Sequence, residues 1–257
     1  YVSTNSNRLS VGMDEIPDYL GKAFVAIEDE RFYQHNGIDF KSIIRAGYQF
    51  FKTGGEEAQG ASTITQQLLK NTVFTDWTSE GNNKIKKIKR KIQEQYLALE
   101  ITKYYSKDEI LLRYMNAINL GQNTLGVESA SLRYFGKHCS ELTISECAVI
   151  ASITQNPSKY NPIRHPEENV KRREKCLNKM LELGFISQTQ YDEAMADTDA
   201  VYERIGLYDI DYQEANATTG SYFSDAVYEQ VKQDLILSGY NAVSYTHLRA
   251  HETSAHL

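Results

Sequence analysis

The chain has 257 residues, enough for one large domain with a well-buried core. Its net charge of −6 argues against a protein that binds nucleic acid with its whole surface. The sequence has no long apolar run that could span a bilayer and no signal-peptide pattern, so we expect a fragment whose membrane anchor is absent.

Apolar periodicity predicts a mainly α protein, because no stretch alternates convincingly like a strand. The predicted helices cover, in chain order, residues 17–34, 40–53, 62–70, 84–105, 107–119, 125–135, 143–155, 166–183 and 187–196. Between the third and fourth helices, Thr75–Asn83 is a polar stretch that we expect to form a mobile loop. From about Ala200 the pattern becomes a polar connector, followed by a further helix over Tyr222–Ser238.

Local start signals support several of these helices. Pro17 suits a first helical turn, Asp39 is a good N-cap for the second helix, and Ser62 or Thr63 can cap the third. The second helix has an apolar stripe from Phe40 to Phe51, and the fourth has one made of Ile85, Ile88, Ile92, Tyr96 and Leu99.

The three cysteines, Cys139, Cys147 and Cys176, are an odd number without the spacing of metal ligands. We therefore expect buried free thiols rather than a disulfide framework or a zinc site.

The first chemically distinctive segment is EDERFYQHNGID, from Glu28 to Asp39. On a continuous helix Glu28, Phe32 and His35 would share one face, with a carboxylate beside an aromatic ring and an imidazole. Such a glutamate could work as a general base if it is partly shielded from water. Taken alone, the segment fits an amphipathic helix with solvated acids better than a catalytic site.

The second segment is GASTITQQLLKN, from Gly60 to Asn71. A short helix here would present a dense group of hydroxyl, amide and ammonium side chains from Ser62, Thr63, Gln66, Gln67 and Lys70. Neutral donors beside one cation suit a sugar and a phosphate. A plain polar helix with a Ser or Thr cap explains the pattern equally well.

The third segment is RKIQEQYLALE, from Arg90 to Glu100, and it begins within a basic run from Lys84 to Lys91. On a helix Lys87, Arg90, Lys91 and Glu94 lie within a sector of about 100°, so one carboxylate is surrounded by cations. These residues suit a pyrophosphate site. A solvated charged face with pairing between neighbouring turns is the simpler alternative.

In this order and at these separations, the three segments resemble the first three motifs of the family 51 glycosyltransferases, the peptidoglycan glycan polymerases. Lys107–Lys137 resembles the fourth family segment and Ser145–Pro162 the fifth. Two positions depart from the family pattern, since Leu112 stands where an acid is usual and Asn119 where an aromatic residue is usual. We expect both departures to affect local packing rather than activity.

The segment Gly220–Asn241 resembles the connector that leads to the transpeptidase in class A penicillin-binding proteins. The resemblance implies a bifunctional parent with an N-terminal anchor and a C-terminal transpeptidase domain, both missing here. No serine lies in a Ser-x-x-Lys signature, and the tripeptide Lys52-Thr53-Gly54 is interpreted as a helix end.

We therefore divide the chain into a glycosyltransferase domain over residues 1–200, a connector over 201–242 and a tail over 243–257. The tail sequence SYTHLRAHET looks more like translated adapter sequence than native protein. His247 and His251 have the spacing of paired metal ligands on a helix, but a non-native tail explains them more simply.

The family resemblance implies a lysozyme-like helical domain with a smaller membrane-facing lobe, at the extracytoplasmic face of a bacterial membrane. The substrate would be lipid II, a disaccharide-pentapeptide on a polyprenyl pyrophosphate, together with the growing glycan strand. By this analogy Glu28 removes the proton from the acceptor 4-hydroxyl, which attacks the anomeric carbon of the donor with inversion, and Asp29 supports Glu28 or its helix.

On the leaving-group side, the resemblance makes Lys70, Arg90 and Lys91 candidates for a pyrophosphate clamp. Glu94 would orient these cations or hold a divalent metal such as Mg²⁺, while Ser62 and Gln67 contact sugar or phosphate. Two other functions stay open at this point. One is a muramidase or lytic transglycosylase that shares the helical fold and a catalytic Glu. The other is a non-catalytic cell-wall scaffold that binds lipid II, or the polymerase inhibitor moenomycin, without turnover.

Overall fold

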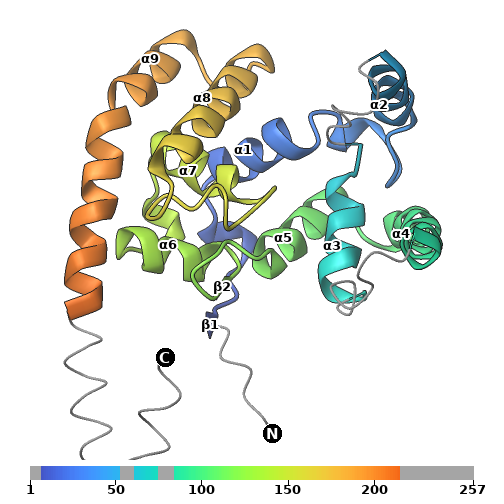
Figure 1. The fold of residues 1–257 in the computed structure, drawn as a ribbon, viewed down its shortest axis with the longest axis horizontal. Helices are drawn as coiled ribbons and strands as arrows, with labels where there is room; N and C mark the ends of the chain where they lie inside the picture. Colours follow the sequence, from blue (N-terminus) through green and yellow to red (C-terminus); the bar gives the residue numbers. More distant parts are fainter. Residues whose placement is uncertain (1–6, 53–60, 75–83, 215–257) are drawn as a thin grey trace, which may run out of the picture. The chain divides into compact units, whose positions relative to one another are not determined.

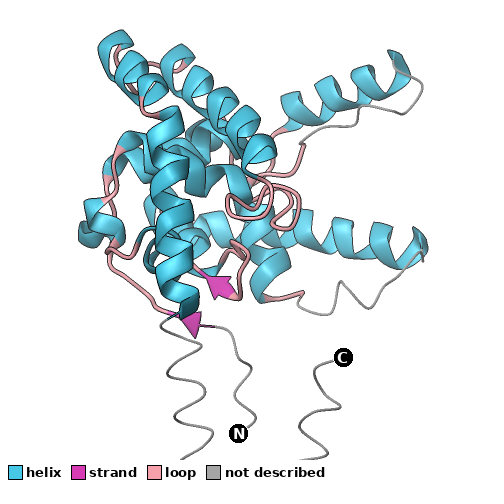
Figure 2. Cartoon of the chain, turned by 60° about the vertical axis from the view of Figure 1, so that its left-hand side comes forward, coloured by secondary structure: helices cyan, strands magenta, loops and turns pink. Residues whose placement is uncertain are grey.

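The computed structural model describes residues 7–52, 61–74 and 84–214. The chain divides after Tyr208 into two compact units, and the second is described only over residues 209–214, which are helical. The first unit is built almost entirely of helices (Figures 1 and 2). Its α-helices are α1 (Asp18–Glu28), α2 (Phe40–Lys52), α3 (Ile64–Thr72), α4 (Lys84–Tyr104), α5 (Lys107–Ala117), α6 (Val127–Phe135), α7 (Ile144–Ile153), α8 (Pro166–Glu182) and α9 (Gln188–Ala196).

Short elements join these helices. They are the 3-10 helices η1 (Met13–Glu15), η2 (Phe32–Gln34) and η4 (Cys139–Glu141), and the two-residue strands β1 (Asn7–Arg8) and β2 (Thr124–Leu125), which pair in parallel. The mainly α prediction is therefore confirmed.

The main core surrounds α1. This helix packs against α7 and α8, and Leu20, Phe24 and Val25 on it are almost completely buried. Burial of such large apolar side chains is the main favourable term in folding. Cys139, Cys147 and Cys176 are all buried and unbridged, as predicted.

The predicted first helix is too long. It was expected to reach Gln34, but α1 ends at Glu28 because the backbone of Asp29 turns away with φ −158° and ψ 70°. Phe32 then lies in the separate helix η2, so Glu28, Phe32 and His35 do not share one helical face. The physical reason is a competing contact, because the Asp29 carboxylate interacts with the amide of Ile64 and with His35, both outside the helix.

A smaller lobe contains α2, α3 and α4 and has a core of its own, made of Ile38, Leu69 and Ala98. Figure 1 shows α2 and α4 on the side of the body away from α9. The α4 helix docks at Gly37, where φ is +91° and a Cβ atom would lie 2.1 Å from the carbonyl oxygen of Ala98. Only glycine allows this approach without displacing the α4 backbone.

The predicted apolar stripe of α4 does not face a core. Ile85, Ile88, Ile92 and Tyr96 are each more than 60% exposed, whereas Glu94 and Ala98 are buried. The predicted stripe of α2 is similarly open, with Ile44 72% exposed and Phe51 88% exposed. Apolar periodicity identifies the residues of each stripe, but it does not indicate whether the stripe packs against the protein core or against an apolar surface outside the chain.

The remaining helices lie close to their predicted ranges, with differences at their ends. The pattern was expected to lose its helical packing near Ala200, but residues 198–208 are helical, and Val201 and Ile205 are fully buried. The predicted loop Thr75–Asn83, the helix Tyr222–Ser238 and the tail lie outside the described residues. Leu112 packs partly buried against the main core, and Asn119 accepts a hydrogen bond from the amide of Gly121 in a turn.

Candidate active site

The end of α1 and the start of α3 are joined by Asp29. Its buried carboxylate accepts a hydrogen bond from the backbone amide of Ile64, at 3.0 Å, and lies 3.0 Å from Nε2 of His35. An unpaired amide at a helix N-terminus is a favourable partner for an anion. Asp29 therefore fixes the position of α3 relative to Glu28, which agrees with a supporting role.

Glu28 has partners on both carboxylate oxygens. Oε1 accepts hydrogen bonds from Arg172, at 2.7 Å, and from the hydroxyl of Thr154, at 2.5 Å, while Oε2 accepts from Nε2 of Gln67 at 2.9 Å. The Glu28 side chain is only 10% exposed. Three elements, α3, the end of α7 and α8, thus hold this carboxylate in one orientation at the mouth of a cleft.

The amide of Gln67 is itself oriented by Tyr114. The Tyr114 hydroxyl donates to Oε1 of Gln67 at 3.1 Å, which leaves the Gln67 amino group directed at Glu28. Tyr114 is fully buried, and this burial, with the nearby charge of Glu28, raises its pKa well above the usual range. Tyr114 therefore remains a neutral donor at physiological pH.

Sequence reasoning missed Arg172 and Thr154. They lie 144 and 126 residues from Glu28 and are brought to it only by the packing of α7 and α8 against α1. The Arg172 guanidinium also donates to the carbonyl of Ser152 and to the side chain of Gln155. These two hydrogen bonds fix the orientation of the guanidinium group that donates to Glu28. Thr154 falls in the fifth segment, but no local pattern singles it out.

The predicted cluster of opposite charges on α4 is present. Glu94 is 1% exposed and contacts Arg90, and its Oε2 lies 3.0 Å from Nζ of Lys91. Lys91 also donates to the hydroxyl of Ser62 at 2.8 Å. Ser62 therefore links the charged face of α4 to the segment that precedes α3, while Lys70 lies half-buried in the last turn of α3.

Thr63 and Gln66 belong to the polar group that suits a sugar and a phosphate, and in this structure they form the cap of α3. Thr63 and Gln66 are 2% and 1% exposed, and each side chain accepts a hydrogen bond from the backbone amide of the other. The Thr63 hydroxyl also donates to the carbonyl of Gly37 at 2.7 Å. The reciprocal bonds satisfy amides that a helix start leaves unpaired, so both side chains have a capping role.

We expect Thr63→Ala to lower the free energy of unfolding by about 1–2 kcal/mol, because it removes both the cap and the bond to Gly37. Thr63→Ser should lose less than half of this, since it keeps the hydroxyl. Equilibrium urea unfolding measures the difference. Thr72→Ala at the other end of α3 is the control, because that hydroxyl only donates within the helix. Equal stability of Thr63→Ala and the unmodified chain would contradict the capping role.

A cleft with a volume of about 340 Å³ lies beside Glu28. Its lining includes Glu28 and Asp29 from the end of α1, Ser62 and Thr63 before α3, and cations on the facing helices. The complete lining is Ala26, Ile27, Glu28, Asp29, Glu30, Asp39, Ser42, Arg45, Ala61, Ser62, Thr63, Lys175 and Lys179. Arg90, Lys91 and Glu94 are not among these lining residues, and Lys91 is connected to the cleft through its hydrogen bond to Ser62.

The surroundings of Glu94 do not fit a divalent metal. Its two contacts are the cations Arg90 and Lys91, which would repel Mg²⁺. Within the described ranges no three His, Cys, Asp or Glu side chains lie close enough together to hold a metal ion. The geometry favours Glu94 as the group that orients the two cations.

Comparisons with known proteins place the chain in a family. The family model described as Transglycosylase matches residues 1–181. Penicillin-binding protein 1A of Clostridium perfringens is 42% identical over 253 residues, which are 95% of this chain and 29% of that protein. Penicillin-binding protein 1A of Aquifex aeolicus is 43% identical over 188 residues, 73% of this chain and 25% of that protein.

A crystal structure of penicillin-binding protein 1A from Haemophilus influenzae matches 74% of this chain and 17% of that chain, with a TM-score of 0.43 and 25% sequence identity. The chain thus spans less than a third of the length of these relatives.

Proposed function

Because the chain belongs to the transglycosylase family, as a peptidoglycan glycosyltransferase domain of the class A penicillin-binding protein type, we propose that it polymerises lipid II into glycan strands. The observation that carries this proposal is the partly buried, oriented carboxylate of Glu28 in a cleft that is also lined by Ser62, the hydrogen-bond partner of Lys91. The carboxylate suits proton removal, and the cations linked to Ser62 suit an anionic leaving group.

In the proposed reaction the acceptor 4-hydroxyl binds beside Glu28, in place of one of its present donors. Glu28 takes the hydroxyl proton while the oxygen bonds to the anomeric carbon of the donor sugar. The bond from that carbon to the pyrophosphate oxygen breaks on the opposite face, so the configuration inverts. Gln67 and Arg172 keep the carboxylate aligned, which matters because proton transfer needs hydrogen-bond geometry.

The leaving group is polyprenyl pyrophosphate, and Arg90 and Lys91 on α4, together with Lys70 on α3, are the residues we propose to neutralise it. Cations that are held in place before the reaction stabilise the developing charge without reorganisation. Glu94 supplies that fixation from a buried position. Because pyrophosphate leaves as a stable anion, a second acid such as hydrolases use is not required.

The exposed apolar side chains of α2 and α4 fit a domain that works at a membrane surface, on the extracytoplasmic side where lipid II is used. Phe40, Ile44 and Tyr48 on α2 are each at least 65% exposed. On α4 the exposed isoleucines lie among lysines, which suits anionic phospholipid. No described helix combines the length and the apolar character that a bilayer span requires.

We expect Ile44→Ser to weaken binding to vesicles of anionic phospholipid by about fivefold, since inserting one such side chain contributes roughly 1 kcal/mol. Vesicle co-sedimentation measures this directly. Leu207→Ser is the matched control, because Leu207 is 60% exposed but lies outside the lobe. If both variants weakened binding equally, or neither did, the lobe would not be the membrane-facing surface.

A further inference from the structure

A second cavity lies beside the first turns of α1 and has a volume of about 440 Å³. It shares no lining residue with the cleft that holds Glu28. Its size falls within the range of small-molecule sites in proteins. Nothing in the proposed reaction uses it.

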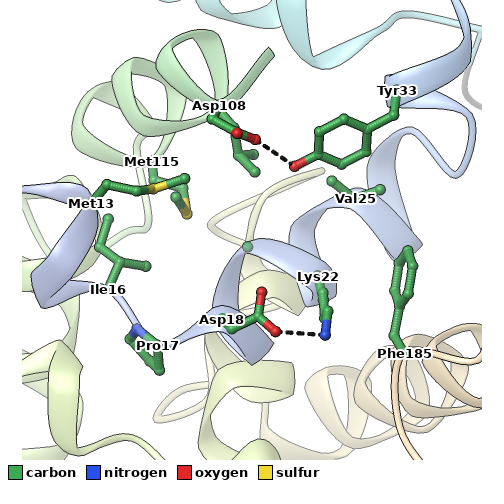
Figure 3. A pocket seen from close by; sticks show the side chains of 12 residues that line it. Met13, Ile16, Pro17, Asp18, Lys22, Val25, Tyr33, Asp108, Met115 and Phe185 are labelled. Atoms are coloured by element: carbon green, nitrogen blue, oxygen red, sulfur yellow. Dashed lines mark hydrogen bonds and ion pairs between the residues drawn. The ribbon is translucent and has the colours of Figure 1, made fainter. Parts of the chain in front are cut away.

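The walls of this cavity are apolar. They are formed by Met13, Ile16, Val25, Leu111, Met115 and Phe185. Figure 3 shows Met13, Ile16 and Met115 on one side and Phe185 on the other. Methionine side chains adapt easily to the shape of an apolar ligand, and they also make favourable contacts with aromatic rings.

Polar groups lie at two opposite edges (Figure 3). At one edge Asp108 accepts a hydrogen bond from the Tyr33 hydroxyl at 3.0 Å, and at the other Asp18 pairs with Lys22 at 2.5 Å. Burial, together with the bond to Asp108, raises the pKa of Tyr33 to about 12, so Tyr33 is a neutral donor. Lys22 offsets the charge of Asp18, whereas Tyr33 does not offset the charge of Asp108. The lining therefore has a net negative charge.

We propose that this cavity binds a small organic cation with an apolar body, such as a protonated amine on a single ring. The charge lies beside Asp108, and the apolar part lies against Met115 and Phe185. A neutral analogue loses the attraction to the carboxylate, and an anionic analogue is repelled. The inference rests on the cavity itself and does not depend on the proposed function.

The position of the cavity connects it with the cleft. Leu111 and Met115 in its wall belong to α5, which also carries Tyr114, the residue that orients Gln67. Val25 belongs to α1, which ends at Glu28. An occupant therefore contacts two helices that hold the Glu28 network.

The four methionines allow a direct test with the whole chain. Met13 and Met115 line the cavity, whereas Met180 and Met195 do not. The protein is labelled with ¹³C on the methionine methyl groups and titrated with 2-phenylethylammonium chloride. We expect the resonances of Met13 and Met115 to shift in a saturable way, while those of Met180 and Met195 stay in place.

The charge dependence is tested with 2-phenylethanol and with a carboxylate variant. We expect Asp108→Asn to weaken binding of the cation by about fivefold, the effect of one partly exposed charge pair, and Asp199→Asn, at an exposed position away from the cavity, to change nothing. Unmoved Met180 and Met195 resonances show that each variant is folded. The proposal would be overturned if the alcohol bound as well as the cation, or if all four methionines shifted equally. It would also be overturned if no resonance shifted at about 10 mM cation, a concentration at which a millimolar site is mostly filled.

Discussion

Replacing Glu28 with Gln is expected to slow glycan formation from lipid II by at least about a thousandfold, a size typical for removal of a general base. The substitution keeps the shape of the side chain and an oxygen that accepts from Arg172 and Thr154. It removes the ability to take the acceptor proton, together with the charge that pairs with Arg172 and the second oxygen, which accepts from Gln67. The rate is measured with purified protein and labelled lipid II, in detergent or a bilayer because the substrate is lipid-linked.

Glu30→Gln is the matched control, because Glu30 lines the same cleft but pairs with Arg45 and Lys179 instead of the network around Glu28. It should retain most of the activity. Thermal unfolding of both variants checks that the fold is intact. Near-normal turnover by a folded Glu28→Gln variant would remove Glu28 as the base.

Replacing Glu94 with Gln should reduce the rate at least about tenfold, equivalent to roughly 1.4 kcal/mol of barrier. Glu94 is buried between Arg90 and Lys91, and a neutral amide can no longer hold two cations that repel each other. We expect the loss to appear mainly in kcat, because the clamp acts on charge that develops as pyrophosphate leaves.

The control for Glu94 lies on the same helix. Glu100 pairs with Lys103 at 2.6 Å in an exposed position, so Glu100→Gln removes a comparable ion pair without reaching the cleft. It should leave kcat unchanged. If Glu94→Gln behaved in the same way, Glu94 would be a structural charge and the assignment of the leaving-group side would fail.

Sequence patterns predicted the parts of this structure that depend on short-range rules. A cap at Asp39 and one at Ser62 or Thr63 were predicted because such side chains bond to amides within three residues, and Asp39 and Thr63 form these bonds. The cluster of Arg90, Lys91 and Glu94 was predicted because helical spacing alone places them on one face.

Features that depend on distant packing were not predictable in this way. The early end of α1 follows from the use of Asp29 by His35 and by the amide of Ile64, 35 residues away. Arg172 reaches Glu28 only because α8 packs against α1. Gln66 looked like an exposed polar residue, but the cap of α3 turns it into a buried one.

Both carboxylates therefore depend on neighbours that their own segments do not contain. Glu28 needs Gln67, Thr154 and Arg172 for its orientation, and Glu94 needs the link from Lys91 to Ser62 to reach the cleft. The proposed division of work between proton removal and leaving-group stabilisation rests on these contacts.

The most direct test of the proposed function supplies the purified chain with labelled lipid II in one reaction and with finished peptidoglycan in another, each with and without moenomycin. We predict glycan polymer from lipid II, loss of that polymer with moenomycin, and no soluble fragments from finished peptidoglycan. Soluble muropeptides from finished peptidoglycan, with no polymer from lipid II, would contradict the proposal and identify a lytic enzyme.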